Sequence, residues 1–149
     1  MTNKGLEQVI TSLLKTQSIG VLATYDGSIP YCSLVAFAAT GDLKNIVFAT
    51  MRDTRKYSNL KNSPNISILI DSRTNRIEDF SDAMALTALG AITEPTSGEK
   101  ASLLGLFMSR HPYLRDFVLD PDCALIRMDI KKYILVTHFK EVSELVIGK

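Results

Sequence analysis

The stretch that decides the fold is Ile46-Val47-Phe48-Ala49-Thr50-Met51-Arg52-Asp53-Thr54-Arg55-Lys56-Tyr57. An apolar run typical of a strand ends at Thr50, a short polar loop follows, and a helical pattern begins near Thr54. Asn62-Ser63-Pro64 ends this helix because proline cannot continue the hydrogen-bond ladder. A strand that leads through a short loop into a helix presents free backbone N–H groups, and these favour an anion.

The first turn of the predicted helix carries three side chains suited to phosphate. Thr54 offers a hydroxyl donor, Arg55 a planar fork of donors and Lys56 a point charge. Cations at a helix N-terminus oppose the helix dipole unless an anion lies there. Residue chemistry alone therefore leaves two interpretations open, a phosphate site and a charged helix start that faces water.

Outward from this stretch, the pattern predicts mostly antiparallel strands joined by tight turns. Asp26-Gly27 is a hairpin signal between two apolar runs, and Gly90 lies inside a strand pattern where a bulge is expected. The tail, residues 139–147, fits either a helix or a short strand. The expected strands are 19–25, 29–39, 45–50, 66–70, 84–93, 123–129 and 133–138, and the expected helices are 3–16, 54–61 and 97–109, with a further helical turn at 113–117.

This order predicts an α+β fold, an antiparallel split β-barrel of six to seven strands with flanking helices. A chain of 149 residues with 46% hydrophobic and 22% charged residues suits a single domain over residues 1–149. The net charge of +1, from 17 basic and 16 acidic residues, gives no electrostatic footprint for nucleic acid or an anionic membrane.

The cysteine pattern excludes the usual metal sites. Cys32 and Cys123 are far apart in sequence and both lie in apolar surroundings, so we expect buried free thiols and no metal. The acidic residues around the 72–81 segment are expected to form a solvated loop. We see no signal peptide and no apolar stretch that could span a bilayer, and we therefore expect a cytoplasmic protein.

The decisive segment resembles the pyridoxamine 5′-phosphate oxidase-like FMN-binding split-barrel family. The shared pattern is Phe-x-Thr-x-x-x-(Ser/Thr)-Arg-Lys, then a helix and Asn-x-Pro, then a strand. In this sequence the pattern falls on Phe48, Thr50, Thr54, Arg55, Lys56, Asn62 and Pro64, with one extra residue between the last two. The resemblance extends over roughly residues 15 to 138.

The resemblance implies a role for each matching segment. Arg55 and Lys56 would hold the FMN phosphate with help from Thr54, and Ala49 and Thr50 would line the ribityl or ring region. The strand residues Ser33, Leu34, Val35 and Ala36 would run along the isoalloxazine edge. In this family the flavin lies at a homodimer interface, and His138 or Phe139 of the second subunit is the expected partner contribution.

The chain keeps the cofactor-binding pattern of the family but differs at the positions that bind the substrate. Family enzymes that act on pyridoxamine phosphate carry an arginine where this chain has Ser33-Leu34 and a glutamine where it has Ala85. The chain also lacks their C-terminal Trp and Arg motif and has no Trp at all. We therefore expect an FMN-dependent oxidoreductase of unknown substrate and electron donor, not a true pyridoxamine phosphate oxidase.

Two alternatives stay open at this stage. The segment from His111-Pro112 to His138-Phe139 resembles the haem-utilisation branch of the same superfamily, with His138 as the candidate haem ligand. Haem also needs propionate partners and an apolar slot. The other alternative is a flavin carrier or sensor without catalysis, because the sequence shows no convincing general acid or base.

Overall fold

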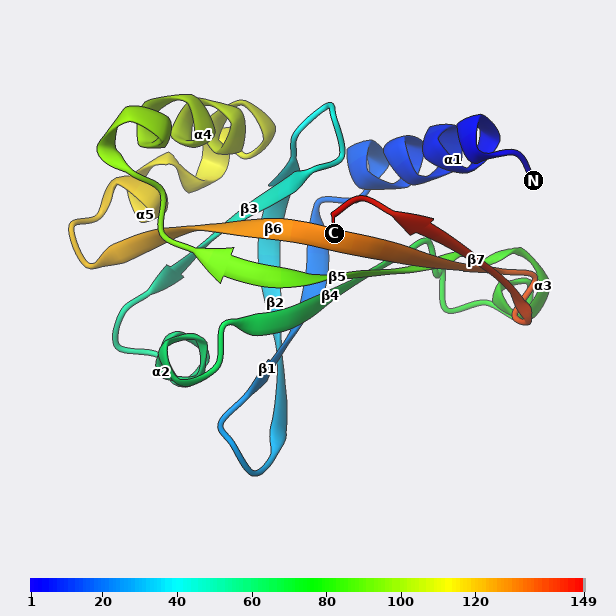
Figure 1. Cartoon of the computed structure of the whole chain (residues 1–149), viewed down its shortest axis with the longest axis horizontal. Helices are drawn as coiled ribbons and strands as arrows, with labels where there is room; N and C mark the ends of the chain where they lie inside the picture. Colours follow the sequence, from blue (N-terminus) through cyan, green and yellow to red (C-terminus); the bar gives the residue numbers. More distant parts are fainter. Residues whose placement is uncertain (149) are drawn as a thin grey trace.

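Six antiparallel strands close into a barrel, and a seventh extends its wall (Figure 1). The computed structural model describes residues 1–148. The strand order is β3-β2-β1-β4-β5-β6-β7, and β3 also pairs with β6, which closes the barrel. The strands are β1 (Ile19–Tyr25), β2 (Pro30–Ala39), β3 (Asn45–Met51), β4 (Asn65–Asp71), β5 (Ala85–Thr93), β6 (Cys123–Thr137) and β7 (Glu141–Val146). The predicted α+β split barrel is confirmed.

Helices flank the barrel at several places (Figure 1). Thr2 caps the first of them by accepting a hydrogen bond from the Gly5 amide, and Thr96 with Glu99 forms a capping box at the start of the fourth. No helix among residues 1–148 is long and apolar enough to cross a membrane. The helices are α1 (Asn3–Thr16), α2 (Arg55–Asn62), α3 (Asp79–Asp82), α4 (Ser97–Arg110) and α5 (Arg115–Leu119), with a 3-10 turn, η1 (Pro112–Leu114).

Strand β3 is buried on both faces, which explains its uninterrupted apolar run. Ile46 and Phe48 point into the barrel core. Val47 and Ala49 belong to a second cluster that Phe107 of α4 and Val118 of α5 complete. Figure 1 shows α4 and α5 together beside this part of the barrel wall. The decisive stretch is therefore sandwiched between the core and the α4–α5 layer.

The two strands expected at 123–129 and 133–138 are a single strand, and that prediction was wrong. β6 changes partners along its length instead of breaking. Its first half pairs with β3, from Met51 opposite Cys123 to Asn45 opposite Asp129, and its second half pairs with β7. The polar residues at the change of partner, Lys131 and Lys132, imitate a turn in the sequence pattern.

The structure settles the conformation of the tail and differs from the prediction for the 72–81 segment. The tail that fitted a helix or a strand is a strand, β7, because its residues pair with β6. The 72–81 segment was expected to be a loop throughout, but its end forms the short helix α3. The Asp79 carboxylate accepts hydrogen bonds from the Thr74 and Asn75 amides and so folds the preceding loop against that helix.

The bulge predicted at Gly90 is confirmed. The β5–β6 register shifts between Leu89 and Gly90, which lie opposite Lys132 and Ile130, so Lys131 is the extra residue. A Cβ atom at position 90 would overlap the carbonyl oxygen of Asp129. Glycine is needed here because the two backbones approach each other closely.

Replacing Gly90 with alanine should destabilise the protein by about 1–3 kcal/mol, because the methyl group must push β5 away from β6. Gly105→Ala is the matched control, since a Cβ atom on that residue of α4 meets nothing within 4 Å. The control should stabilise the protein by about 0.4–1 kcal/mol. Urea unfolding measures both, and equal midpoints for the two variants would contradict the close approach.

Candidate functional site

A cleft of about 180 Å³ lies between the outer face of the barrel and the α4–α5 layer. Leu34, Val35 and Ala36 of β2 and Ala49 of β3 line one side of it. Lys56, from the first turn of α2, lies at its edge. Five of the residues expected from the resemblance therefore line one cleft in one protomer.

The start of α2 brings positive charge to this cleft, and no acidic side chain pairs with that charge. Neither Arg55 nor Lys56 forms an ion pair with any residue in the described part of the chain, 1–148. Their amide groups belong to the first helical turn, which has no internal acceptor for them. The two side chains diverge, since Lys56 lines the cleft while the Arg55 guanidinium lies 5.4 Å from the centre of the Tyr31 ring.

Thr54 and Thr50 hold the loop that precedes α2. The Thr54 hydroxyl donates to the Met51 carbonyl oxygen at 2.8 Å and accepts from the Tyr57 amide at 3.3 Å, which makes it the helix N-cap. Thr50 is fully buried, and its hydroxyl lies 3.1 Å from that of Thr54. In this structure both hydroxyl groups support the loop geometry.

Arg52 ties the same loop to the start of β6. Its guanidinium donates to the carbonyl oxygens of Pro121 and Cys123, each at 3.1 Å. The Arg52 amide also donates to the carbonyl oxygen of Asp122 at 2.9 Å. Burial raises the pKa of the neighbouring Cys123 thiol, which keeps it protonated and unreactive at neutral pH. The loop between β3 and α2 is thus fixed at both of its ends.

The β1–β2 hairpin lies close to Arg55 and carries an anion of its own. The Asp26 carboxylate accepts the amides of Ser28 at 2.7 Å and Ile29 at 2.8 Å. These backbone hydrogen bonds, first that of Ile29, lower the pKa of Asp26, and the charge of Arg55 contributes to the same shift. Asp26 is therefore ionised at neutral pH and attracts the Arg55 side chain toward the hairpin.

The opposite wall of the cleft comes from α4, η1 and α5. Phe107, Leu114 and Phe117 contribute the apolar surface. His111 is buried behind them, where its Nε2 donates to the Phe37 carbonyl oxygen at 2.6 Å and its ring packs against Phe107. This hydrogen bond fastens the wall to β2. His111 is thereby a positioning residue for the cleft.

Five of the expected residues do not line the cleft. Thr50, Thr54 and Arg55 belong to the end of β3 and the start of α2 beside it, whereas Ser33 and His138 have other surroundings. Ser33 does not line the cleft, and its buried hydroxyl has no hydrogen-bond partner among residues 1–148. His138 lies just past the far end of β6, whereas Cys123 at the start of that strand pairs with Met51 beside the cleft. Its imidazole is largely exposed and lies 3.4 Å from the Glu141 carboxylate. One protomer does not bring His138 to the cleft.

The sequence patterns missed the wall residues Phe107, Leu114 and Phe117. Their signal was present only as helical periodicity in 97–109 and as the helical turn after Pro112. Such periodicity indicates which face of a helix is apolar, but not which strand the face covers.

The chain belongs to the pyridoxamine 5′-phosphate oxidase family, because the sequence model of that family matches residues 6–137. A comparison with curated protein sequences finds no match.

Similar solved structures share the fold at low identity. A haem-binding protein from Mycobacterium smegmatis aligns with a TM-score of 0.79 at 15% identity, over 91% of this chain and 56% of that one. An FAD-binding protein from Mesorhizobium loti aligns with a TM-score of 0.69 at 16% identity, over 86% and 90% of the two chains. General stress protein 26 from Bacillus anthracis aligns with a TM-score of 0.68 at 22% identity, over 94% and 98%.

Removing the Thr54 hydroxyl tests whether it caps α2. Thr54→Ala should cost about 1 kcal/mol of stability, because the Tyr57 amide loses its acceptor. Thr54→Ser keeps the hydroxyl and should lose much less. Urea denaturation of both variants decides, and an equal loss for serine and alanine would show that the methyl group matters instead.

Proposed function

We propose that this protein binds FMN in the cleft and acts as a flavin-dependent oxidoreductase. The observation that carries the proposal is the convergence of Leu34, Val35, Ala36, Ala49 and Lys56 on one apolar cleft. These are positions to which the family pattern assigns contacts with FMN. The pairing of β2 with β3, and the short loop that leads from β3 into α2, bring these residues together at one place.

The charges and surfaces of the cleft suit the parts of FMN. Lys56 and the first-turn amides of α2 supply positive charge for the phosphate at the edge of the cleft. Arg55 of the same turn, whose side chain lies over Tyr31 and forms no ion pair among residues 1–148, is proposed to join them. The edge of β2 from Leu34 to Ala36 and the side chains of Phe107 and Phe117 supply an apolar surface for a planar ring. Bound flavin would supply electron transfer between a donor and an acceptor, while the protein binds and orients it.

A homodimer would complete the site. The cleft volume of about 180 Å³ is below the roughly 300–1,000 Å³ of typical small-molecule sites. Leu34 is 68% exposed at its rim, and Phe117 is partly exposed there. A second subunit that covers these side chains would enlarge and enclose the cleft. The turn containing His138 and Phe139 is the segment proposed to do so.

The substrate differs from pyridoxamine phosphate under this proposal. Ser33-Leu34 and Ala85 replace the arginine and the glutamine of the family enzymes, so two polar contacts are missing. The substrate is proposed to be a small molecule, and no nucleic acid or membrane takes part. Cys123 is buried as expected, whereas Cys32 is exposed, so the prediction of two buried thiols was wrong for Cys32. Both are free thiols, which supports a reducing, cytoplasmic setting.

Haem is the second candidate ligand, favoured by one observation, the exposed imidazole of His138. The other histidine, His111, already uses its Nε2 atom to donate a hydrogen bond to the Phe37 carbonyl oxygen. A haem-binding protein is among the proteins of similar fold. The absorption spectrum of the purified protein separates the candidates, because a band near 450 nm indicates flavin and a Soret band indicates haem. A colourless protein that binds neither would refute both.

The double variant Arg55→Ala with Lys56→Ala should abolish FMN retention and leave the fold intact. Each charge-assisted hydrogen bond contributes about 1.5–3 kcal/mol, so affinity should fall by at least about 100-fold. Isothermal titration with FMN measures the affinity, and far-ultraviolet circular dichroism checks the fold.

The matched control for this variant is Lys4→Ala with Lys15→Ala. Both lysines lie on α1, so the control removes the same charge away from the cleft. Its FMN affinity should equal that of the unmodified protein. Unchanged FMN affinity in the Arg55/Lys56 variant would overturn the phosphate assignment, and an equal loss in both variants would show a non-specific charge effect.

A further inference from the structure

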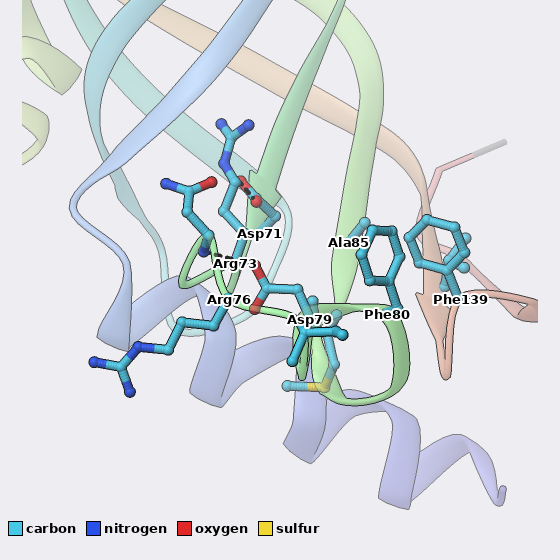
Figure 2. A pocket seen from close by; sticks show the side chains of 12 residues that line it. Asp71, Arg73, Arg76, Asp79, Phe80, Ala85 and Phe139 are labelled. Carbon is cyan, nitrogen blue, oxygen red and sulfur yellow. Dashed lines mark hydrogen bonds and ion pairs between the residues drawn. The ribbon is translucent and has the colours of Figure 1, made fainter.

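A second and larger cavity, of about 760 Å³, lies at the opposite end of the barrel (Figure 2). It is bounded by the end of β4, the loop and helix α3 that follow, the start of β5 and the β6–β7 turn. Val136 of β6 lines this cavity, while Leu125 of the same strand pairs with Ala49 of the cleft. Eleven residues of extended strand separate the two, roughly 35 Å. The cavity is therefore distinct from the cleft of the same protomer.

Aromatic and aliphatic side chains dominate one side of this cavity. Phe80 of α3 and Phe139 of the β6–β7 turn pack edge to face, with ring centres 5.5 Å apart (Figure 2). Each is 66% exposed, and Ile77 is 79% exposed. Large apolar side chains gathered around a concave surface mark a binding site, and the volume is that of a small-molecule pocket.

The backbone places Phe139 in this wall at a conformational cost. His138 and Phe139 have φ angles of 50° and 63°, and the Lys140 amide donates to the Thr137 carbonyl oxygen at 3.2 Å. Such a turn favours Asn-Gly, because bulky residues with positive φ are strained. Phenylalanine at this position does not stabilise the turn. Its ring forms part of the cavity wall instead.

The charged side chains around the cavity cancel one another. Asp71 and Arg73 form an ion pair at 2.9 Å. The Thr74 hydroxyl donates a hydrogen bond to the Asp79 carboxylate, as do the amides of Thr74 and Asn75. These hydrogen bonds, first that of the hydroxyl, lower the pKa of Asp79, so it stays ionised and balances Arg76. Figure 2 shows both guanidinium groups directed away from the two phenylalanine rings. Two acidic and two basic side chains give no preference for a charged ligand.

We propose that this cavity is a binding site for an uncharged, planar aromatic molecule, held mainly by Phe80 and Phe139. A concave pocket of this size suits a small molecule better than a flat protein surface. If the 138–139 turn meets the cleft of a second subunit, as the proposed function requires, the molecule bound here is the substrate of that subunit's flavin. The substrate role rests on the proposed function, whereas the binding itself does not.

Titration calorimetry with 2-naphthol at pH 7, on the protein as purified, tests the proposal. We expect measurable binding that weakens about tenfold or more in Phe80→Ala and in Phe139→Gly, since each removes an aromatic contact. Phe139→Gly should keep or raise the unfolding temperature, because glycine relieves the positive φ. Val142→Ala is the control, since this exposed residue of β7 does not line the cavity, and its binding should be unchanged.

Several results would overturn the proposal. If 2-naphthol does not bind to the unmodified protein, the proposal is wrong. It is also wrong if Phe139→Gly loses 2-naphthol binding only because the variant no longer folds. Tenfold tighter binding of 2-naphthoate would refute the uncharged class. If Phe80→Ala binds 2-naphthol as before but dissociates into monomers, the cavity is a contact between copies of this chain. FMN affinity, measured in parallel, separates the two proposals, because naphthol binding without FMN binding refutes only the proposed function.

Discussion

The pairing of β3 with β6 is the interaction on which the rest of the structure depends. It joins residues more than 70 positions apart, from Asn45 opposite Asp129 to Met51 opposite Cys123, and it converts an open sheet into a barrel. Because Met51 is fixed against Cys123, the loop that follows β3 reaches the loop that precedes β6, and Arg52 bonds the two together. The start of α2 and the α4–α5 layer are thereby held at the same end of the barrel, on either side of the cleft.

This closure also explains why the apolar run of β3 has no polar face. One face meets the barrel core through Phe48, and the other meets Phe107 of α4 through the second cluster. His111 fastens that layer with its bond to the Phe37 carbonyl oxygen, so the distance between wall and barrel is set by a hydrogen bond as well as by packing. The cleft is the space that these fixed elements leave next to Lys56.

Local signals made most of the fold predictable. The Asp26-Gly27 turn, the Thr96–Glu99 capping box and the bulge at Gly90 each follow from the chemistry of one or two residues, and each is present. β6 was split in the prediction because two lysines interrupt its apolar pattern. The strand continues because β5 pairs with it across this point, from Arg127 to Val136, while its other edge changes partner from β3 to β7. Pairing between distant strands leaves no local mark in a sequence.

The candidate site was predictable on one side only. The residues of β2, β3 and α2 were found through the family pattern, whereas Phe107, Leu114 and Phe117 come to the cleft through tertiary packing. Thr54 was expected to assist the phosphate, and the structure gives its hydroxyl a structural partner in the Met51 carbonyl oxygen. The sequence did not predict the 760 Å³ cavity. One part of its wall is a segment whose sequence is typical of a polar loop, and another is a turn whose backbone strain is apparent only from its positive φ angles.

The central claim is that the unpaired charges at the start of α2 recognise the phosphate of a flavin. Comparing the affinities of FMN and riboflavin for the unmodified protein tests it most directly, because riboflavin has the same ring and ribityl chain without the phosphate. The account predicts that FMN binds at least about 100-fold more tightly, and that rising salt concentration narrows the difference. Equal affinities for the two flavins would contradict it.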